Sequence, residues 1–168
     1  MTQLLTLEDS DALVDFETRN KAWFEAWVPA RPEAYFDKDQ FPSVLAELID
    51  GMSASSHLLF VRYQDNQIVG RFNLTNINAG QADVGYRVCQ DYLGQGIASA
   101  GVAFLKRVAV NELNLTRLVA RAATTNTANN IASQKVLLKQ GFDKQPNAQE
   151  RVEFGSKVIV LEQFAVNL

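Results

Sequence analysis

The chain has 168 residues, of which 47% are hydrophobic and 21% charged, a composition typical of a globular protein that buries a core. We therefore expect a single domain over residues 1–168. The formal net charge is −3 and no Lys/Arg-rich run occurs, which disfavours a nucleic-acid-binding surface. The single cysteine, Cys89, and the single histidine, His57, exclude an intrachain disulfide and disfavour a metal site, so we expect no bound metal.

The sequence also lacks the features of a membrane or secreted protein. No segment approaches the roughly 18 to 20 consecutive apolar residues that span a bilayer, and the N-terminus has no basic region followed by an apolar run. We therefore expect a cytoplasmic protein without membrane contact, as a monomer or a homodimer.

The first third of the chain is predicted to be mainly helical. A short strand is expected over residues 4–7, one or two helices over residues 8–28, and a further helix over residues 42–52 after a connection punctuated by prolines. This third is rich in aromatic residues, which we interpret as core, with one wall of a substrate groove as the alternative. They are Trp23, Phe24, Trp27, Tyr35, Phe36 and Phe41.

The middle of the chain changes to the pattern of strands. Residues 57–63, 67–76 and 82–90 are rich in β-branched and aromatic side chains and are separated by turn formers, which predicts an antiparallel meander. His57, at the head of the first strand, is interpreted as structural. Cys89 is interpreted as a small buried strand residue rather than a nucleophile, because no histidine lies near it in the sequence.

A glycine loop over residues 91–96 follows and opens a helix expected over residues 97–111, whose apolar residues form one broad face. Unpaired N–H groups at the start of such a helix favour an anion, which predicts a phosphorylated ligand. The loop lacks the third glycine of a dinucleotide fingerprint and the Gly-Lys-Ser/Thr of a P-loop.

The remainder of the chain alternates between strands and one helix. The expected elements are a strand over residues 116–122, a helix over 128–140 capped by Asn126-Thr127, and strands over 149–154 and 157–166 around a turn at Gly155-Ser156. The order β-α-α-β-β-β-α-β-α-β-β has too many paired strands in its middle for a doubly wound sheet. We therefore expect an α/β (α+β) fold in which a mixed, mostly antiparallel sheet carries helices on both faces.

Two sequence motifs resemble the GNAT superfamily of acetyl-CoA-dependent N-acetyltransferases. Gly94-Gln95-Gly96-Ile97-Ala98 resembles the pyrophosphate loop of that family, although Asp91 stands where Gln or Arg is usual. The spacing Asn130-x-x-Ser133-x-x-Val136-Leu137-x-Lys139-x-Gly141-Phe142 is similar to the Rim-type enzymes, which acetylate the N-termini of ribosomal proteins. The resemblance covers roughly residues 3–165. It implies the acyl-CoA N-acyltransferase fold with about seven strands, and acetyl-CoA as cosubstrate.

The same resemblance implies how the cosubstrate is held. Backbone groups around Arg87, Val88 and Cys89 would pair with the pantetheine amides, and Asn130 would hold the pantetheine from the other side. The pyrophosphate would accept hydrogen bonds from the loop, which comprises Leu93, Gly94, Gln95, Gly96, Ile97 and Ala98.

Acetyl transfer also needs a proton for the leaving thiolate and a deprotonated amine. Many GNAT enzymes carry a tyrosine acid at the position of Leu137, so this chain resembles the variant that uses a serine, with Ser133 as the acid. The alternative for Ser133 is a helix hydroxyl that bonds back to a carbonyl. Glu150 lies where the Rim-type pattern places an acidic residue and is the candidate base, with Asp83 as the second candidate.

The expected activity is therefore direct, sequential transfer of acetyl from acetyl-CoA to the N-terminal α-amine of a protein, in particular a ribosomal protein. An α-amine has a pKa of about 8, against about 10.4 for lysine, so a weak base suffices. Two alternatives stay open: a small-molecule amine as acceptor, and a catalytically inactive CoA-binding module, for which Asp91 is the support.

Overall fold

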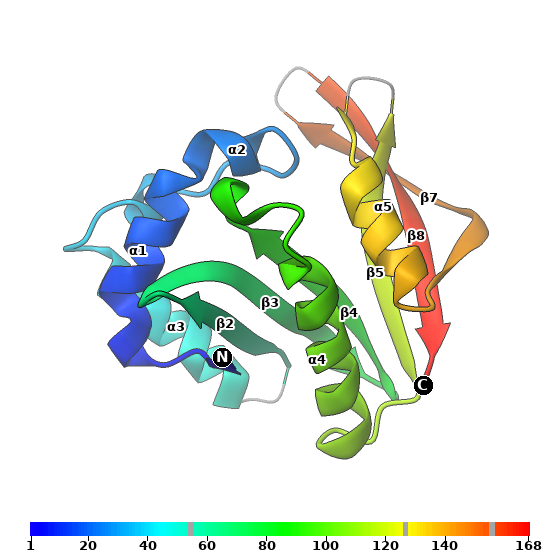
Figure 1. Cartoon of the computed structure of the whole chain (residues 1–168), viewed down its shortest axis with the longest axis horizontal. Helices are drawn as coiled ribbons and strands as arrows, with labels where there is room; N and C mark the ends of the chain where they lie inside the picture. Colours follow the sequence, from blue (N-terminus) through cyan, green and yellow to red (C-terminus); the bar gives the residue numbers. More distant parts are fainter. Residues whose placement is uncertain (54–55, 126–127, 155–156) are drawn as a thin grey trace.

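The computed structural model describes residues 1–53, 56–125, 128–154 and 157–168. Figure 1 shows a strongly twisted sheet with helices packed on it. Its strands are β1 (Thr2–Leu4), β2 (Leu58–Gln64), β3 (Gln67–Asn78), β4 (Gln81–Val88), β5 (Arg117–Thr125), β6 (Ala128–Asn129), β7 (Asp143–Phe154) and β8 (Lys157–Asn167). Its α-helices are α1 (Ser10–Arg19), α2 (Lys21–Glu25), α3 (Phe41–Ser53), α4 (Ile97–Asn111) and α5 (Ile131–Lys139).

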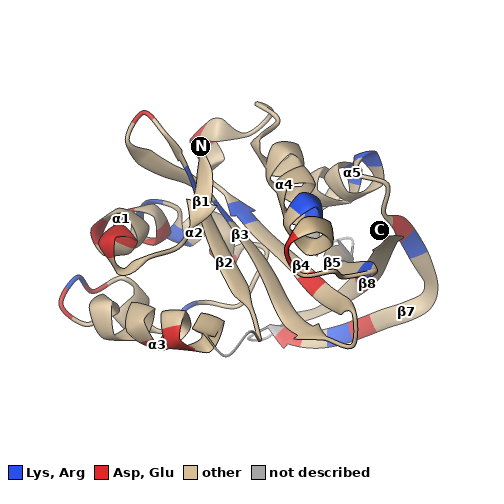
Figure 2. Cartoon of the chain, turned by 90° about the horizontal axis from the view of Figure 1, so that it is seen from below, with Lys and Arg blue, Asp and Glu red and all other residues tan. Residues whose placement is uncertain are grey.

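The strands form a mixed sheet in the order β1-β2-β3-β4-β5-β8-β7, with β6 paired to β5. Every described pair is antiparallel except β4 with β5, which is parallel. The two main hydrophobic cores lie between the sheet and the helices on each of its faces. One packs α4 and α5 against one face of the sheet, and the other packs α1 and α3 against the opposite face of β1–β4. Figure 2 shows these helix pairs on opposite sides of the strands. The predicted mostly antiparallel sheet with helices on both faces is confirmed.

Several predicted boundaries shift in the structure. Helix α5 begins at Ile131 rather than at residue 128, because residues 128–129 pair with β5 as β6. Asn130 caps α5: its Oδ1 accepts a hydrogen bond from the Ser133 N–H at 3.0 Å. The predicted cap Asn126-Thr127 lies outside the described residues, as does the predicted turn at residues 155–156.

The ends of the sheet also differ from expectation. Strand β7 starts at Asp143 rather than at 149, and its register against β8 shifts between Lys144 and Gln149. Such a shift breaks the two-residue alternation that marks a strand in sequence. The first strand covers Thr2–Leu4, and the residues that follow form a short 3-10 turn, Leu7–Asp9.

Helix α4 lies very close to the sheet. A Cβ added at Gly101 would lie 1.8 Å from the ring of Phe72, a fully buried residue of β3. Glycine at this position therefore sets the distance between α4 and the strands, and with it the position of the glycine loop that precedes α4.

Strands β4 and β5 separate along their length and leave a V-shaped opening in the sheet. Their ladder runs from Gln81–Arg117 to Val84–Ala120, whereas β4 continues to Val88 and β5 to Thr125. Figure 1 shows the two strands close together near the C-terminus and diverging toward α2 and α5. The opening is the feature that positions the site.

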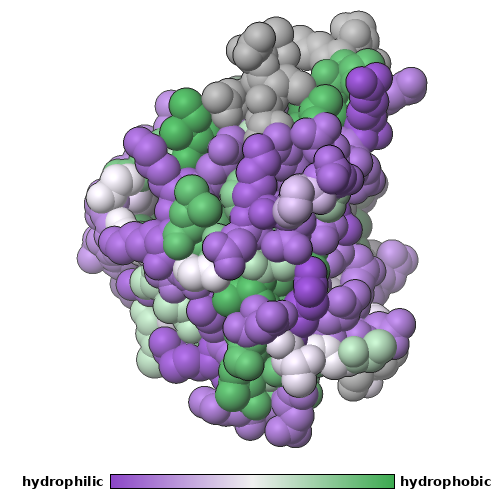
Figure 3. All heavy atoms as spheres, turned by 90° about the vertical axis from the view of Figure 1, so that its right-hand side faces the viewer, coloured by the Kyte–Doolittle hydropathy of each residue, from purple (hydrophilic) through white to green (hydrophobic). Residues whose placement is uncertain are grey.

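The outer surface over β7, β8 and α5 is mostly hydrophilic, and its apolar residues form separate small patches rather than one continuous area (Figure 3). No helix in the described part of the chain is long and apolar enough to cross a membrane.

Candidate active site

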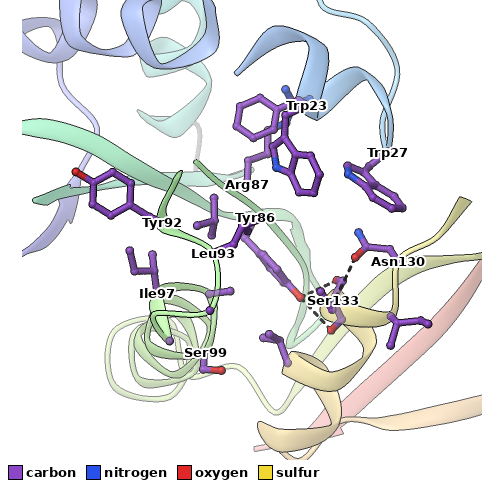
Figure 4. A pocket seen from close by; sticks show the side chains of 18 of the residues that line it. Trp23, Trp27, Tyr86, Arg87, Tyr92, Leu93, Ile97, Ser99, Asn130 and Ser133 are labelled. Atoms are coloured by element: carbon purple, nitrogen blue, oxygen red, sulfur yellow. Dashed lines mark hydrogen bonds between the residues drawn. The ribbon is translucent and has the colours of Figure 1, made fainter. Parts of the chain in front are cut away.

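A cavity of about 630 Å³ occupies the opening on the side of α4 and α5, and Figure 4 shows it at close range. Its walls come from α2, the end of β4, the glycine loop, the first turn of α4, and the start of α5. Among the residues that line it are Trp23, Phe24, Trp27, Tyr86, Arg87, Val88, Leu93, Gly94, Gly96, Ile97, Ala98, Asn130 and Ser133. We call it the first cavity.

Eight of the ten residues expected to bind the cosubstrate line the first cavity. The exceptions are Gln95 and Cys89. The side chain of Cys89 is buried in the core formed with α1 and α3, and its N–H donates to the Val69 carbonyl oxygen at 2.9 Å. Cys89 directly follows β4, and the burial predicted for its side chain is confirmed. Its N–H is occupied by β3 and is not available to the cosubstrate.

The glycine loop presents open backbone to the first cavity. Gly94 and Gly96 have φ values of +76° and +77°, a conformation that residues with a Cβ rarely adopt. An ideal Cβ at either position would meet nothing within 4 Å, so the conformation rather than close packing requires glycine. The N–H groups of the first turn of α4 have no partner within the helix, which suits an anion.

The edge of β4 offers further backbone groups. Because Cys89 donates its N–H to β3, and strand backbone groups alternate in direction, the N–H and carbonyl of Val88 face the opening. The same alternation turns the backbone of Tyr86 toward β5, beyond the last described pair of the β4–β5 ladder at Val84–Ala120. An extended ligand with amide groups can pair with this edge as an added strand would.

Ser133 lies at the inner end of the first cavity and contacts Tyr86. The Tyr86 hydroxyl is 2.7 Å from Ser133 Oγ and also donates to the Ser133 carbonyl oxygen at 3.2 Å. Burial raises the pKa of Tyr86 to about 12, and the hydrogen bond with Ser133 opposes that rise in part. Tyr86 therefore stays protonated at neutral pH. Figure 4 shows Tyr86 and Asn130 converging on Ser133.

Two residues noted from the sequence lie away from this chemistry. Leu137 is fully buried in the core beneath α4, so α5 presents no side chain to the first cavity at that position. His57 Nε2 bonds the carbonyl oxygen of Leu48 at 3.0 Å, and its ring packs against Gly51 of α3. His57 thus fastens α3 to the start of β2 and lines neither cavity of the site.

A second cavity, of about 310 Å³, lies on the opposite face of the sheet. It is bounded by the loop after α2 and by β4, β5, β7 and β8. It shares Trp27, Val28, Tyr86, Arg87, Asn130 and Ser133 with the first cavity. The two cavities therefore meet at the V-shaped opening, one from each face of the sheet.

Both candidate bases pair with one arginine at the rim of the second cavity. Glu150 Oε2 lies 3.2 Å from Arg121 Nε, and Asp83 Oδ2 lies 2.9 Å from Arg121 Nη1. Arg121 and Val152 line the second cavity, and Glu150 is two residues from Val152 on the same face of β7. Neither carboxylate lines either cavity. Glu150 lies beside the second cavity, and its side chain is 58% exposed.

A buried charged cluster next to the opening was not predicted. Glu17 of α1 is 1% exposed and pairs with Arg71 of β3 at 3.2 Å and with Arg87 of β4 at 3.1 Å. Burial lowers the pKa of Arg87 to about 10; repulsion by Arg31 adds to this, and Glu17 opposes it. The sequence holds one clue to the cluster, an acidic residue beside Phe16 on the apolar face of α1.

Comparison with known proteins gives a consistent result. The family model described as "Acetyltransferase (GNAT) domain" matches residues 2–143. The chain is 24% identical to the probable N-acetyltransferase YjcK of Bacillus subtilis (strain 168) over 154 residues, which cover 89% of this chain and 83% of that protein.

Solved structures share the fold. The ribosomal-protein-S5-alanine acetyltransferase from Vibrio fischeri superposes with a TM-score of 0.89 at 22% identity, covering 99% of this chain and 91% of the other. Mycobacterium smegmatis RimJ, in complex with CoA-disulfide, gives a TM-score of 0.85 at 21% identity, covering 99% and 80%. The family match spans most of the chain, including β4, the glycine loop and α5, so this chain belongs to the GNAT acetyltransferase family and is an N-acetyltransferase.

Proposed function

We propose that the protein binds acetyl-CoA in the first cavity and transfers its acetyl group to the N-terminal α-amine of a protein in the second. The observation that carries this proposal is the meeting of the two cavities at the V-shaped opening, with Ser133 in the wall of both. Acetyl-CoA supplies an activated thioester. The protein must hold the thioester and admit an amine from the opposite side. It must also remove a proton from the amine and supply a proton to the leaving thiolate.

The first cavity fits the parts of acetyl-CoA in order. The glycine loop, with open space where a Cβ would stand, suits the pyrophosphate. The exposed edge of β4 at Tyr86 and Val88 suits the pantetheine amides. Asn130 uses its Oδ1 to cap α5 and keeps its amide nitrogen for the opposite side of the same arm.

Ser133 is the group we assign to protonation of the leaving thiolate. Its N–H is held by Asn130 and its Oγ by Tyr86, so the hydroxyl has a fixed position at the junction. Tyr86 positions Ser133 and, because it stays protonated, can pass a proton on to it.

Glu150 is the group we assign to deprotonation of the amine. It lies at the rim of the second cavity, so it acts through water, which suffices for an α-amine with a pKa of about 8. Asp83 is less suited, because its Oδ2 already accepts hydrogen bonds from both Arg121 and Asn76.

For the acceptor we propose the N-terminus of a ribosomal protein, which implies a cytoplasmic enzyme. Its support is the similarity of the fold to a ribosomal-protein-S5-alanine acetyltransferase, together with the partly exposed residues Arg121 and Glu150 at the rim of the second cavity, which leave room for a protein end.

The test is an acetyl-CoA assay over N-terminal peptides and polyamines, followed by thiol release and mass spectrometry. We expect acetylated peptide N-termini and intersecting initial-rate plots, as for direct sequential transfer. Transfer to polyamines alone would refute the protein acceptor, and acetyl-CoA binding without any transfer would refute the activity.

Two pairs of variants test the assigned roles. Ser133→Ala should lower kcat by about a hundredfold or more, the usual contribution of an acid catalyst, with acetyl-CoA affinity unchanged. Ser43→Ala, an exposed helix serine, is its control. Glu150→Gln should lower kcat at pH 6 more than at pH 9, where the amine is already deprotonated. Glu153→Gln, on the other face of β7, should have no effect.

A further inference from the structure

The charged cluster beside the second cavity carries more positive than negative charge. Among the residues that the structure describes, Glu17 is the one carboxylate paired with Arg71 and Arg87, and all three side chains are at most 16% exposed. Arg31, in the loop after α2, has no carboxylate oxygen within 4 Å among the residues that the structure describes. Glu25, whose Oε1 is buried, lines a small pocket with Glu17, Arg31 and Arg87, so three guanidinium groups stand against two carboxylates here.

The excess positive charge affects the pKa values of the buried arginines. Proximity to Arg31 lowers the pKa of both Arg71 and Arg87, in addition to the larger effect of burial. Holding excess positive charge away from water costs free energy unless an opposite charge is supplied. A ligand with a negative charge would restore the balance.

The second cavity is where such a ligand can reach the cluster. Arg31 and Arg87 both line it, together with Trp27 and Asn73. Arg31 Nε and Trp27 Nε1 are buried and have no hydrogen-bond partner among the described residues, although the Arg31 guanidinium lies 4.8 Å from the centre of the Tyr35 ring. Both N–H groups can therefore donate to an acceptor atom of a ligand. The Oδ1 of Asn73 is buried without a donor in the same cavity, which suits an N–H of the same ligand.

The other charges of the second cavity do not serve this purpose. Arg121 is already paired with Asp83 and Glu150, which together give that end of the cavity a net negative charge. The two ends of the cavity therefore differ in sign. The positive end adjoins the junction with the first cavity, because Arg87 and Trp27 line both cavities, as Ser133 does.

We propose that Arg31 and Arg87, with the indole N–H of Trp27, form an anion subsite that selects acceptor amines carrying a carboxylate or phosphate close to the amine. The inference rests on the proposed function, because it assumes that the acceptor occupies the second cavity. In a peptide acceptor, the anion is the side chain of an acidic or phosphorylated residue at the first or second position.

The test compares acceptors that differ only in this charge. One pair is a peptide beginning Ala-Asp and its Ala-Asn counterpart, and a second pair is 2-aminoethyl phosphate and ethanolamine. We expect kcat/KM to be at least about tenfold higher for the anionic member, as for a hydrogen bond to a charged group. The preference should shrink as NaCl is raised, because salt screens the attraction.

Arg31→Gln should reduce the ratio between the two members of each pair toward one while acetyl-CoA affinity stays the same. Lys38→Gln is the matched control: it removes one positive charge from the same connecting segment, at an exposed side chain paired with Asp15, and should keep the ratio. Equal rates for both members, or a ratio that Arg31→Gln leaves intact, would overturn the anion subsite. Absence of transfer to every acceptor would instead overturn the proposed function itself.

Discussion

Replacing Glu17 by Gln tests whether the buried cluster holds uncompensated charge. The substitution keeps the side-chain volume and one hydrogen-bond acceptor. It removes the negative charge that pairs with both Arg71 and Arg87 in the described part of the chain. Removing one partner of a buried ion pair costs about 3 to 5 kcal/mol, because the other charge is left without a counter-ion. Since Gln retains one acceptor, we expect the lower end, about 3 kcal/mol.

The measurement is urea unfolding followed by the fluorescence of Trp23 and Trp27. Glu33→Gln is the control: Glu33 pairs with Lys21 at 3.0 Å, but its side chain is 86% exposed, so the loss should stay below about 1 kcal/mol. A triple variant, Glu17→Leu with Arg71→Met and Arg87→Met, should recover most of the lost stability, because it removes both arginine charges together with their shared partner.

Equal losses for Glu17→Gln and Glu33→Gln would refute the reasoning, since they would mean that water reaches the cluster. Failure of the triple variant to recover stability would refute it too, because the cost of Glu17→Gln would then come from shape rather than charge.

Three further predictions concern the site and its support. Gly101→Ala should lower the free energy of unfolding by about 1 to 3 kcal/mol, measured by urea titration, because crowding against Phe72 outweighs the helix propensity of alanine. Gly94→Glu should abolish acetyl-CoA binding by calorimetry, through its charge at the pyrophosphate position; unchanged affinity would argue against that position. Tyr86 has a pKa raised above its unfolded value, so its contribution to stability is complete below about pH 10 and is lost as pH rises to about 12. Tyr86→Phe should therefore reduce the alkaline loss of stability, and a variant with the wild-type pH dependence would contradict the assignment.

The sequence predicts best the parts of the fold that local pattern controls. Helix α4 has the expected bounds, residues 97–111, because a glycine loop starts it and one apolar face runs through it. The early part of β7 was missed because its register shift hides the alternation. The start of α5 was misplaced because the pairing of residues 128–129 with β5 depends on contacts that no local pattern contains.

The same division holds for the candidate site. The glycine loop, Asn130 and Ser133 belong to short sequence motifs, so they could be identified without the structure. The cluster around Glu17 joins residues 54 and 70 positions apart, so only the folded chain brings them together. Likewise, the sequence offered Asp83 and Glu150 as rival bases, and the structure shows that both pair with Arg121.

The V-shaped opening places the two cavities on opposite faces of the sheet, so most residues of one cavity can change without altering the other. The first cavity opens over α4 and α5, and the second over the face formed by β7, β8 and the loop after α2. Under the proposed function neither substrate has to pass the other, so spent CoA would leave from the first cavity while a polypeptide still occupies the second. Substitutions in the loop after α2, or in β7 and β8, can therefore change which amine is accepted while leaving the glycine loop and the thioester chemistry intact.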